Sequence, residues 1–102
     1  MIHVLAIITA KPGMRATILE AFHANMQAVY AEDGCSEYQP VIDVDNFGAI
    51  QTPLGPDSFV VVEKWATADA LKAHGAAPHM AAYGAKTRPL VASRVIHVLQ
   101  NG

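Results

Sequence analysis

The sequence predicts an α+β fold with an antiparallel sheet, and two observations lead to this expectation. Short stretches rich in β-branched and aromatic residues are separated by segments with helical periodicity, and the resulting order is β-α-β-β-α-β. A chain of 102 residues also has the length of one compact domain. We therefore expect residues 1–102 to form a single domain.

The predicted strands differ in the strength of their signals. The first covers residues 2–10 and is closed by a Lys-Pro-Gly sequence, which is typical of a turn. The second covers residues 35–44, and its Pro40 favours an edge position because proline cannot donate to a ladder. Residues 58–65, "SFVVVEKW", give the strongest strand signal, and residues 90–100 form the last strand.

The helical segments are indicated by periodicity and by capping residues. Between residues 13 and 31 the apolar side chains recur at steps of three and four, as in an amphipathic helix. Thr67 caps a second helix that we expect to end near Gly75, and Pro78 begins a further turn or short helix that ends near residue 86. This order of elements is that of the ferredoxin-like split βαβ, in which the first and last strands are antiparallel neighbours.

Composition excludes several functional classes. The net charge is −2 and the seven Lys and Arg residues are scattered, so we expect no nucleic-acid partner. The single cysteine, Cys35, cannot form an intrachain disulfide, and the first ten residues do not resemble a signal peptide. No apolar run approaches the ~20 residues of a membrane-spanning helix, so we expect a cytoplasmic protein without membrane contact.

Both faces of the predicted sheet are apolar. The first strand places Val4, Ala6 and Ile8 on one face and Leu5 and Ile7 on the other. Two helices cover only one face of a four-stranded sheet, and a chain this short has nothing left for the second. We therefore expect a homodimer that pairs through the open sheet faces.

Residues 63–80 concentrate the groups that can carry chemistry. Glu63 shares strand parity with Trp65 on an apolar face, where desolvation would raise its pKa unless it pairs with an arginine such as Arg94 or lies at the wet rim of the interface. His74 and His79 are five residues apart, a spacing that suits one metal poorly but allows proton transfer or hydrogen bonding to a substrate. In the alternative, His74 contacts carbonyl groups at the end of its helix, and His79 merely starts the next helix.

Aromatic and sulfur-containing side chains form a second group of candidates. They are expected either to line a flat pocket for an aromatic ligand or to be core residues; the set comprises Trp65, Phe22, Tyr38, Phe47, Met80 and Tyr83. The chain has no Gly-rich phosphate loop, nucleophile elbow, C-x-x-C pair or dinucleotide fingerprint.

The segments "GCSEYQPVID" and "VVVEKWATADALKAHGAAPHM" resemble the antibiotic biosynthesis monooxygenase family. The most recognisable pattern is E-x-W followed by a leucine and H-x-x-x-P-H, and the resemblance covers nearly the whole chain. It implies a ferredoxin-like dimeric α/β barrel that oxidises quinols, anthrones or related polyphenols with O₂ as co-substrate. It also implies that no metal, flavin or haem is needed, because the substrate supplies the electrons.

The resemblance also implies roles for the candidates. His74 or His79 accepts a proton, Glu63 orients or tunes it, and Trp65 and Tyr83 form a stacking or hydrogen-bonding wall. Haem-degrading relatives use other residues where this chain has Ala6, His74 and Gly84, so we expect no haem degradation.

One departure from the family pattern is the connection 45–57, which is longer than the link of many members. We expect it to fold over the cavity and to alter the substrate.

Two other functions fit the same residues. One is a non-catalytic dimer that binds a small aromatic molecule. The other is a muconolactone-type isomerase, which rests on analogy of fold alone. Of the three, only the oxygenase consumes O₂.

Overall fold

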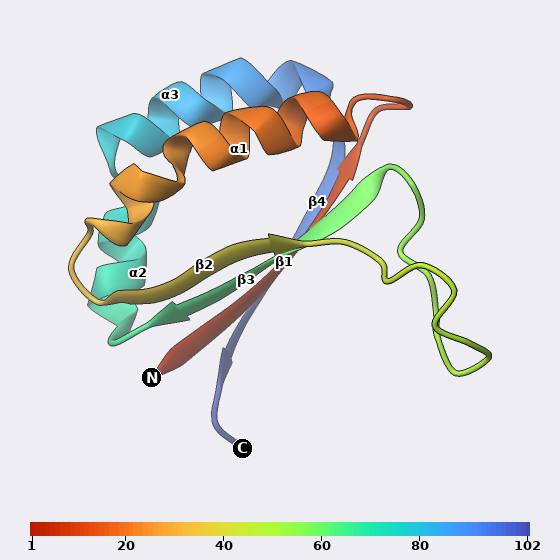
Figure 1. Ribbon diagram of the computed structural model, residues 1–102. Helices are drawn as coiled ribbons and strands as arrows, with labels where there is room; N and C mark the ends of the chain where they lie inside the picture. Colours follow the sequence, from red (N-terminus) through yellow and green to blue (C-terminus); the bar gives the residue numbers. More distant parts are fainter.

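The computed structural model describes all residues from 1 to 102 and contains one four-stranded sheet with the strand order β2-β3-β1-β4. Every neighbouring pair is antiparallel, including β1 and β4. Helices α1 and α3 lie together over one side of this sheet (Figure 1). The elements in order are β1 (Ile2–Ala10), α1 (Arg15–Tyr30), β2 (Cys35–Val41), β3 (Ser58–Trp65), α2 (Ala68–Gly75), α3 (Pro78–Thr87), the 3₁₀ turn η1 (Arg88–Leu90) and β4 (Val91–Gln100). The predicted ferredoxin-like α+β fold is thereby confirmed.

The edge position of β2 agrees with Pro40, whereas the predicted end of this strand at residue 44 is wrong. β2 ends at Val41, and the chain then turns away from β3. Asp43 follows in the connection, and its carboxylate accepts hydrogen bonds of 2.9 and 3.0 Å from the backbone N–H groups of Leu54 and Gly55. These bonds lower the pKa of Asp43. They also join the start of the connection between β2 and β3 to the end of the same connection.

The connection between β2 and β3, residues 42–57, does not cover the helix side of the sheet. It extends away from α1 and α3 (Figure 1), and its Phe47 and Ile50 are 61% and 86% exposed. The expectation that this segment folds over a cavity is therefore wrong.

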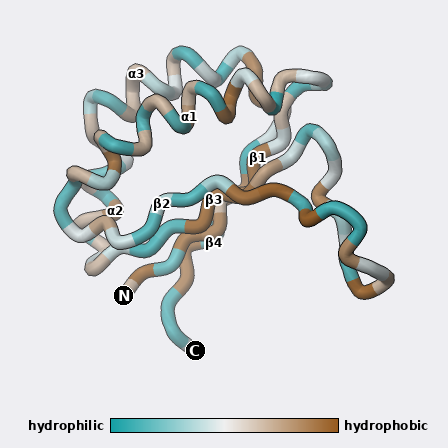
Figure 2. Tube along the Cα trace, viewed as in Figure 1, coloured by the Kyte–Doolittle hydropathy of each residue, from teal (hydrophilic) through white to brown (hydrophobic).

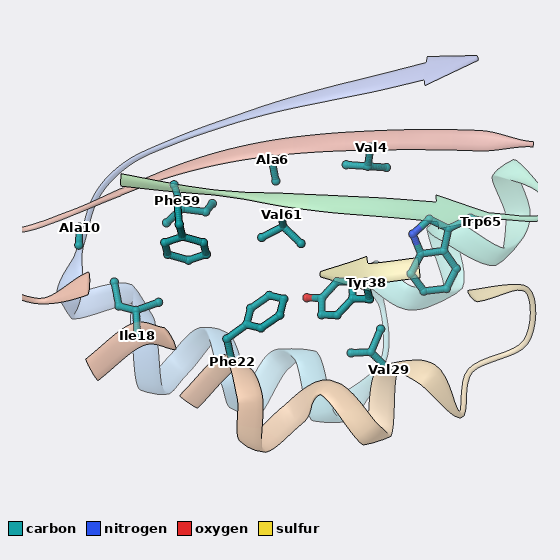
Figure 3. Close-up of a cluster of buried hydrophobic side chains, with 11 residues drawn as sticks. Val4, Ala6, Ala10, Ile18, Phe22, Val29, Tyr38, Phe59, Val61 and Trp65 are labelled. Atoms are coloured by element: carbon teal, nitrogen blue, oxygen red, sulfur yellow. The ribbon is translucent and has the colours of Figure 1, made fainter. Parts of the chain in front are cut away.

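The hydrophobic core lies between α1 and the helix-facing side of the sheet. The alternation of β1 and β3 buries every second side chain there, and residues of α1 pack against them (Figure 3). Burial of this apolar area is the main stabilising contribution, about 25 cal/mol per Å². The largest fully buried side chains are Trp65, Phe22, Phe59, Ile18 and Val29.

The opposite face of the sheet is apolar and has no cover within the chain. Leu5, Val95 and Leu99 are 37%, 49% and 42% exposed, and Val60 and Val62 on the neighbouring β3 are half-buried. Figure 2 shows the apolar character of β1, β3 and β4 and of the start of the segment that leaves β2, whereas β2 itself is mostly hydrophilic. None of the helices has the length and apolar character that crossing a membrane requires.

Candidate active site

A cavity of about 730 Å³ lies between the helices and the helix-facing side of the sheet. This volume is within the range of small-molecule binding sites, ~300–1,000 Å³. Its wall is mostly apolar, with residues of β1, β3, α1 and β4 such as Ala6, Val61, Phe22 and Ile96. The polar groups are few, and two of them, Glu63 and His74, were expected from the sequence.

Glu63 is a buried carboxylate at one end of this cavity. It is 7% exposed, and its Oε1 accepts a hydrogen bond of 2.9 Å from Nε1–H of Trp65. Burial raises the pKa of Glu63, while the bond from Trp65 and the nearby His74 act in the opposite direction. Glu63 has no arginine partner, so the alternative in which it pairs with Arg94 is wrong.

Trp65 holds Glu63 but does not form part of the cavity wall. Its side chain is 0% exposed, and it packs in the core. The expectation that it stacks against a substrate therefore needs correction. Glu63 and Trp65 are two residues apart on β3 and lie on the same face of the strand. The carboxylate of Glu63 reaches the cavity, whereas the indole of Trp65 packs in the core beside it.

His74 is held by a carboxylate that the sequence analysis did not single out. Nδ1 of His74 lies 2.8 Å from Oε2 of Glu32, and both side chains are largely buried. The carboxylate can only accept, so Nδ1 carries the proton, and Nε2 of the neutral ring is then an acceptor. His74 lines the cavity and Nε2 has no partner within the protein. The alternative in which His74 contacts the carbonyls of its own helix is wrong.

A glycine brings Glu32 and His74 together. Gly34, in the turn between α1 and β2, has φ +83°, and a Cβ there would lie 2.9 Å from Cβ of Ala70 on α2. A larger residue would therefore be strained and would push α2 away. The close approach lets the end of α1 present Glu32 to the last turn of α2.

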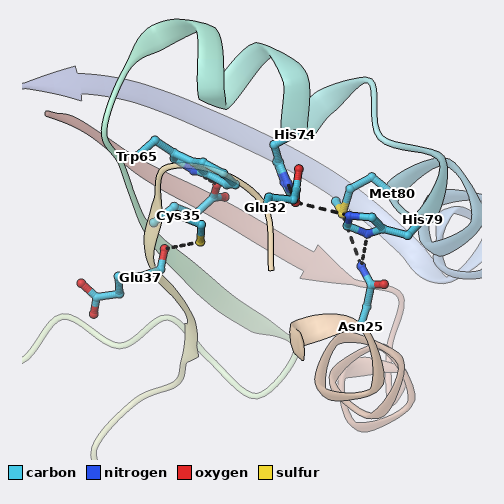
Figure 4. Close-up of polar contacts among 9 residues, drawn as sticks. Asn25, Glu32, Cys35, Glu37, Trp65, His74, His79 and Met80 are labelled. Carbon is cyan, nitrogen blue, oxygen red and sulfur yellow. Dashed lines mark hydrogen bonds and ion pairs between the residues drawn. The ribbon is translucent and has the colours of Figure 1, made fainter. Parts of the chain in front are cut away.

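His79 supports Glu32 from the other side and does not line the cavity (Figure 4). Its Nε2 lies 3.3 Å from Oε2 of Glu32, although the angles do not make a hydrogen bond. Its Nδ1 accepts from the side-chain amide of Asn25 at 3.2 Å, which leaves the ring proton on Nε2 facing the carboxylate. Of the two predicted histidines, only His74 reaches the cavity.

Tyr38 and Phe22 form an aromatic wall next to His74. Their rings stack at 4.8 Å with an interplanar angle of 10°, and the edge of Tyr38 faces His74 at 5.4 Å. Burial, with a smaller contribution from the charge of Glu63, raises the pKa of Tyr38 far above its usual range. Its hydroxyl therefore stays protonated and can donate a hydrogen bond.

Of the remaining candidates, two line the cavity as predicted and one does not. Met80 and Tyr83 line the cavity, and burial raises the pKa of Tyr83. Phe47 lies in the exposed connection and not at the cavity. No set of three or more His, Cys, Asp or Glu side chains converges in a way that could hold a metal ion.

Glu32 and Asn25 belong to the site, although no sequence pattern indicates either of them. Glu32 stands beside Asp33 before the glycine that ends α1, an arrangement equally typical of a solvated helix end. Its contact with His74 joins residues 42 positions apart. Asn25 falls among polar residues of an amphipathic helix, so no local pattern distinguishes it.

Comparisons with known proteins agree with this fold. A family profile described as antibiotic biosynthesis monooxygenase matches residues 1–86. A protein of Escherichia coli K12 named "Probable quinol monooxygenase YgiN" is 35% identical over 104 residues, covering 100% of this chain and 99% of the relative.

Solved structures give the same fold. PA3566 from Pseudomonas aeruginosa superposes with a TM-score of 0.81 at 23% identity, over 99% of this chain and 93% of that one. A Caulobacter crescentus CB15 protein of the same family name has a TM-score of 0.77 at 28% identity, over 99% and 89% of the two chains. The chain thus belongs to the antibiotic biosynthesis monooxygenase family, which makes it a monooxygenase whose substrate these likenesses leave open.

Proposed function

We propose that the protein oxidises an aromatic quinol with O₂ inside the cavity that His74, Glu63 and Tyr38 share. The observation that carries the proposal is the Glu32–His74 contact of 2.8 Å at the wall of an apolar cavity, because this contact occupies Nδ1 and leaves Nε2 without a partner in the protein. The name of the Escherichia coli relative, a quinol monooxygenase, supports the same substrate class.

His74 acts as the base. A quinol hydroxyl at the cavity wall gives its proton to Nε2, and the charge of Glu32 at Nδ1 compensates the positive charge that the imidazole acquires. Glu63 adds a second negative charge close to the ring. General base catalysis of this kind contributes about 10²- to 10⁴-fold.

The hydroxyl of Tyr38 donates to the phenolate oxygen that forms. It remains protonated because of its raised pKa, and it lies on the same wall as His74. Donors already aimed at a developing negative charge stabilise the transition state without reorganisation. The apolar surroundings keep water from the reactive intermediates.

The anion then transfers one electron to O₂, which gives a semiquinone and superoxide. Their recombination forms a carbon–oxygen bond, and the resulting hydroperoxide loses water. One hydroquinone and one O₂ yield one hydroxyquinone and one water, so all the electrons come from the substrate. No metal or organic cofactor takes part in the proposed reaction.

In the proposed assembly, a second copy of the chain covers the face of the sheet opposite the helices. The exposed Leu5, Val95 and Leu99 support this arrangement, since apolar sheet faces are normally covered. Sedimentation of the purified protein measures it directly, and a stable monomer at micromolar concentration would contradict the dimer.

O₂ uptake tests the oxidation. Metal-free protein is assayed with simple hydroquinones and anthrones, and the autoxidation rate of each compound is subtracted. We expect uptake above this background, and a loss of about 10²- to 10⁴-fold in His74→Ala. His23→Ala is the matched control, because His23 is exposed on α1 and has no polar contact.

Two results would contradict the proposal. A flat trace across the whole panel would favour the binding dimer or the isomerase. Uptake that persists in His74→Ala would remove this histidine from the mechanism.

A further inference from the structure

Two arginines line the cavity at the end opposite Glu63. Arg88 is the first residue of η1 after α3, and Arg94 lies on β4. Together with Glu63 they are the only Lys, Arg, Asp or Glu side chains in the cavity wall. The cavity therefore has a carboxylate and a histidine at one end and two permanent positive charges at the other.

Strand register gives the distance between the two ends. Glu63 pairs with Val4, and Arg94 pairs with Ile8, on the two sides of β1. Val4 and Ile8 are both buried on the helix-facing side, and directly paired residues share a face. Four residues of an extended strand separate the two pairs, which corresponds to about 13 Å along β1; β3 and β4 also lie about 10 Å apart across β1, so the two backbone positions are about 16 Å apart.

The wall between the ends is apolar. Ala6, Val61 and Phe22 occupy it, so a flat hydrophobic body fits between the acid–base end and the arginines. Gly84 also belongs to this wall, and a Cβ at this position would lie 3.7 Å from a guanidinium nitrogen of Arg88. The Arg88 guanidinium thus lies beside Gly84 at the cavity, although Arg88 as a whole is exposed.

Neither arginine has a partner within the chain. The ion pairs of the protein are Lys64 with Glu37 and the two histidine contacts of Glu32. By contrast, Arg15 outside the cavity donates to the backbone carbonyls of Gly55 and Ser58. The guanidinium donors of Arg88 and Arg94 are therefore available to a ligand.

We propose that the substrate is a quinol or phenol with an anionic substituent, which Arg88 and Arg94 bind while the reacting hydroxyl lies at His74 and Glu63. This inference rests on the proposed function for the position of the hydroxyl. A carboxylate is the simplest such group, because its two oxygens match the guanidinium fork. The pair of charges fixes which end of an elongated aromatic molecule reaches the base.

The test compares two ligands that differ only in charge. 6-Hydroxy-2-naphthoic acid carries a hydroxyl at one end and a carboxylate at the other, and 6-hydroxy-2-naphthamide is its neutral counterpart of the same shape. Their binding to the full-length protein at pH 7 is measured by titration of naphthol fluorescence, which requires no turnover. We expect the acid to bind about tenfold or more tightly, and the difference to shrink at high salt.

Charge-removing variants connect this preference to the two side chains. In Arg88→Gln/Arg94→Gln the ratio of the two dissociation constants should fall to about one, with little change for the amide. Lys11→Gln/Lys72→Gln is the control, because it removes the same net charge from exposed residues that do not line the cavity. The control should keep the wild-type ratio.

Three results would overturn the inference: equal binding of acid and amide by the wild type, a preference that survives in the arginine variant, or a preference lost equally in the lysine control. Sedimentation of the arginine variant belongs to the same test. A changed assembly state with an unchanged preference would assign the arginines to subunit contacts and also overturn it.

Failure of the oxidation and failure of this inference are distinguishable. If no quinol supports O₂ uptake but the acid still binds preferentially, the proposed reaction is wrong and the proposed binding of an anionic substituent is retained. If neutral quinols are oxidised while acid and amide bind equally, the proposed reaction is retained and the proposed anionic substituent of the substrate is wrong.

Discussion

The two ends of the cavity differ in how far the fold itself satisfies their polar groups. At the Glu63 end the charged and polar groups are buried and contact one another, through Trp65 to Glu63 and through Glu32 to His74. At the arginine end the side chains are exposed and have no protein partner. A buried, interconnected set is fixed in position before substrate arrives, which suits proton transfer, whereas unpartnered charges suit recognition.

Glu32→Gln gives the largest effect that this comparison predicts. The amide oxygen can still accept from Nδ1 of His74, so the ring keeps its place, but the compensating negative charge is lost. Hydrogen bonds to charged groups contribute about 1.5–3 kcal/mol, which corresponds to a fall in kcat of roughly 10- to 150-fold. KM should change little, because Glu32 does not line the cavity.

Glu20→Gln is the matched control for this measurement. Glu20 is exposed on α1 and has no ion pair, so steady-state kinetics should be unchanged. Equal kcat in Glu32→Gln and in the wild type would mean that the carboxylate only holds the fold together. A rise in KM alone would assign it to substrate binding.

Glu63→Gln has a smaller effect, which appears in the pH dependence of stability. Burial raises the pKa of Glu63 in the folded state, so ionisation costs more there than in the unfolded chain. Below the ordinary glutamate pKa of about 4.3 the carboxyl is neutral in both states and the penalty is absent. As pH rises through this value and then through the higher folded pKa, the wild type loses stability relative to the variant.

Urea unfolding at a series of pH values from acid to neutral measures this difference in the free energy of unfolding. Glutamine can still accept from Trp65, so the variant tests the charge and leaves the hydrogen bond in place. Glu20→Gln should track the wild type at every pH. A wild type that gains stability over Glu63→Gln with rising pH would instead indicate that Glu63 is held ionised by a positive partner.

The Glu63 end of the cavity also shows which features of the structure the sequence predicts and which it does not. Local periodicity predicted the order of elements, Pro40 predicted the edge strand, and strand parity predicted that Glu63 and Trp65 share one apolar face. These features depend on residues close together in the chain. The Glu32–His74 contact depends instead on how tightly Gly34 lets the turn after α1 approach Ala70, which no spacing of residues reveals.

Two errors have a similar origin. The family resemblance implied that Trp65 forms a wall of the cavity, yet Trp65 is completely buried in the core, the alternative that the aromatic candidates also allowed. The connection 45–57 was expected over the cavity because of its length, yet it extends away from the helices, and Asp43 just before it bonds to Leu54 and Gly55 near its end. In both cases tertiary structure decided the position, and composition carried no sign of it.

Arg94→Gln gives the smallest predicted effect on the unbound protein. Its side chain is exposed and makes no hydrogen bond or ion pair, so its loss should change the free energy of unfolding by no more than about 0.5 kcal/mol. Trp65→Phe at the other end should cost about 1–3 kcal/mol in the same urea experiment, because it leaves the buried Oε1 of Glu63 without its donor. Comparable losses in the two variants would mean that the arginine end is also held by contacts, those of a second subunit included, and the contrast between the two ends would disappear.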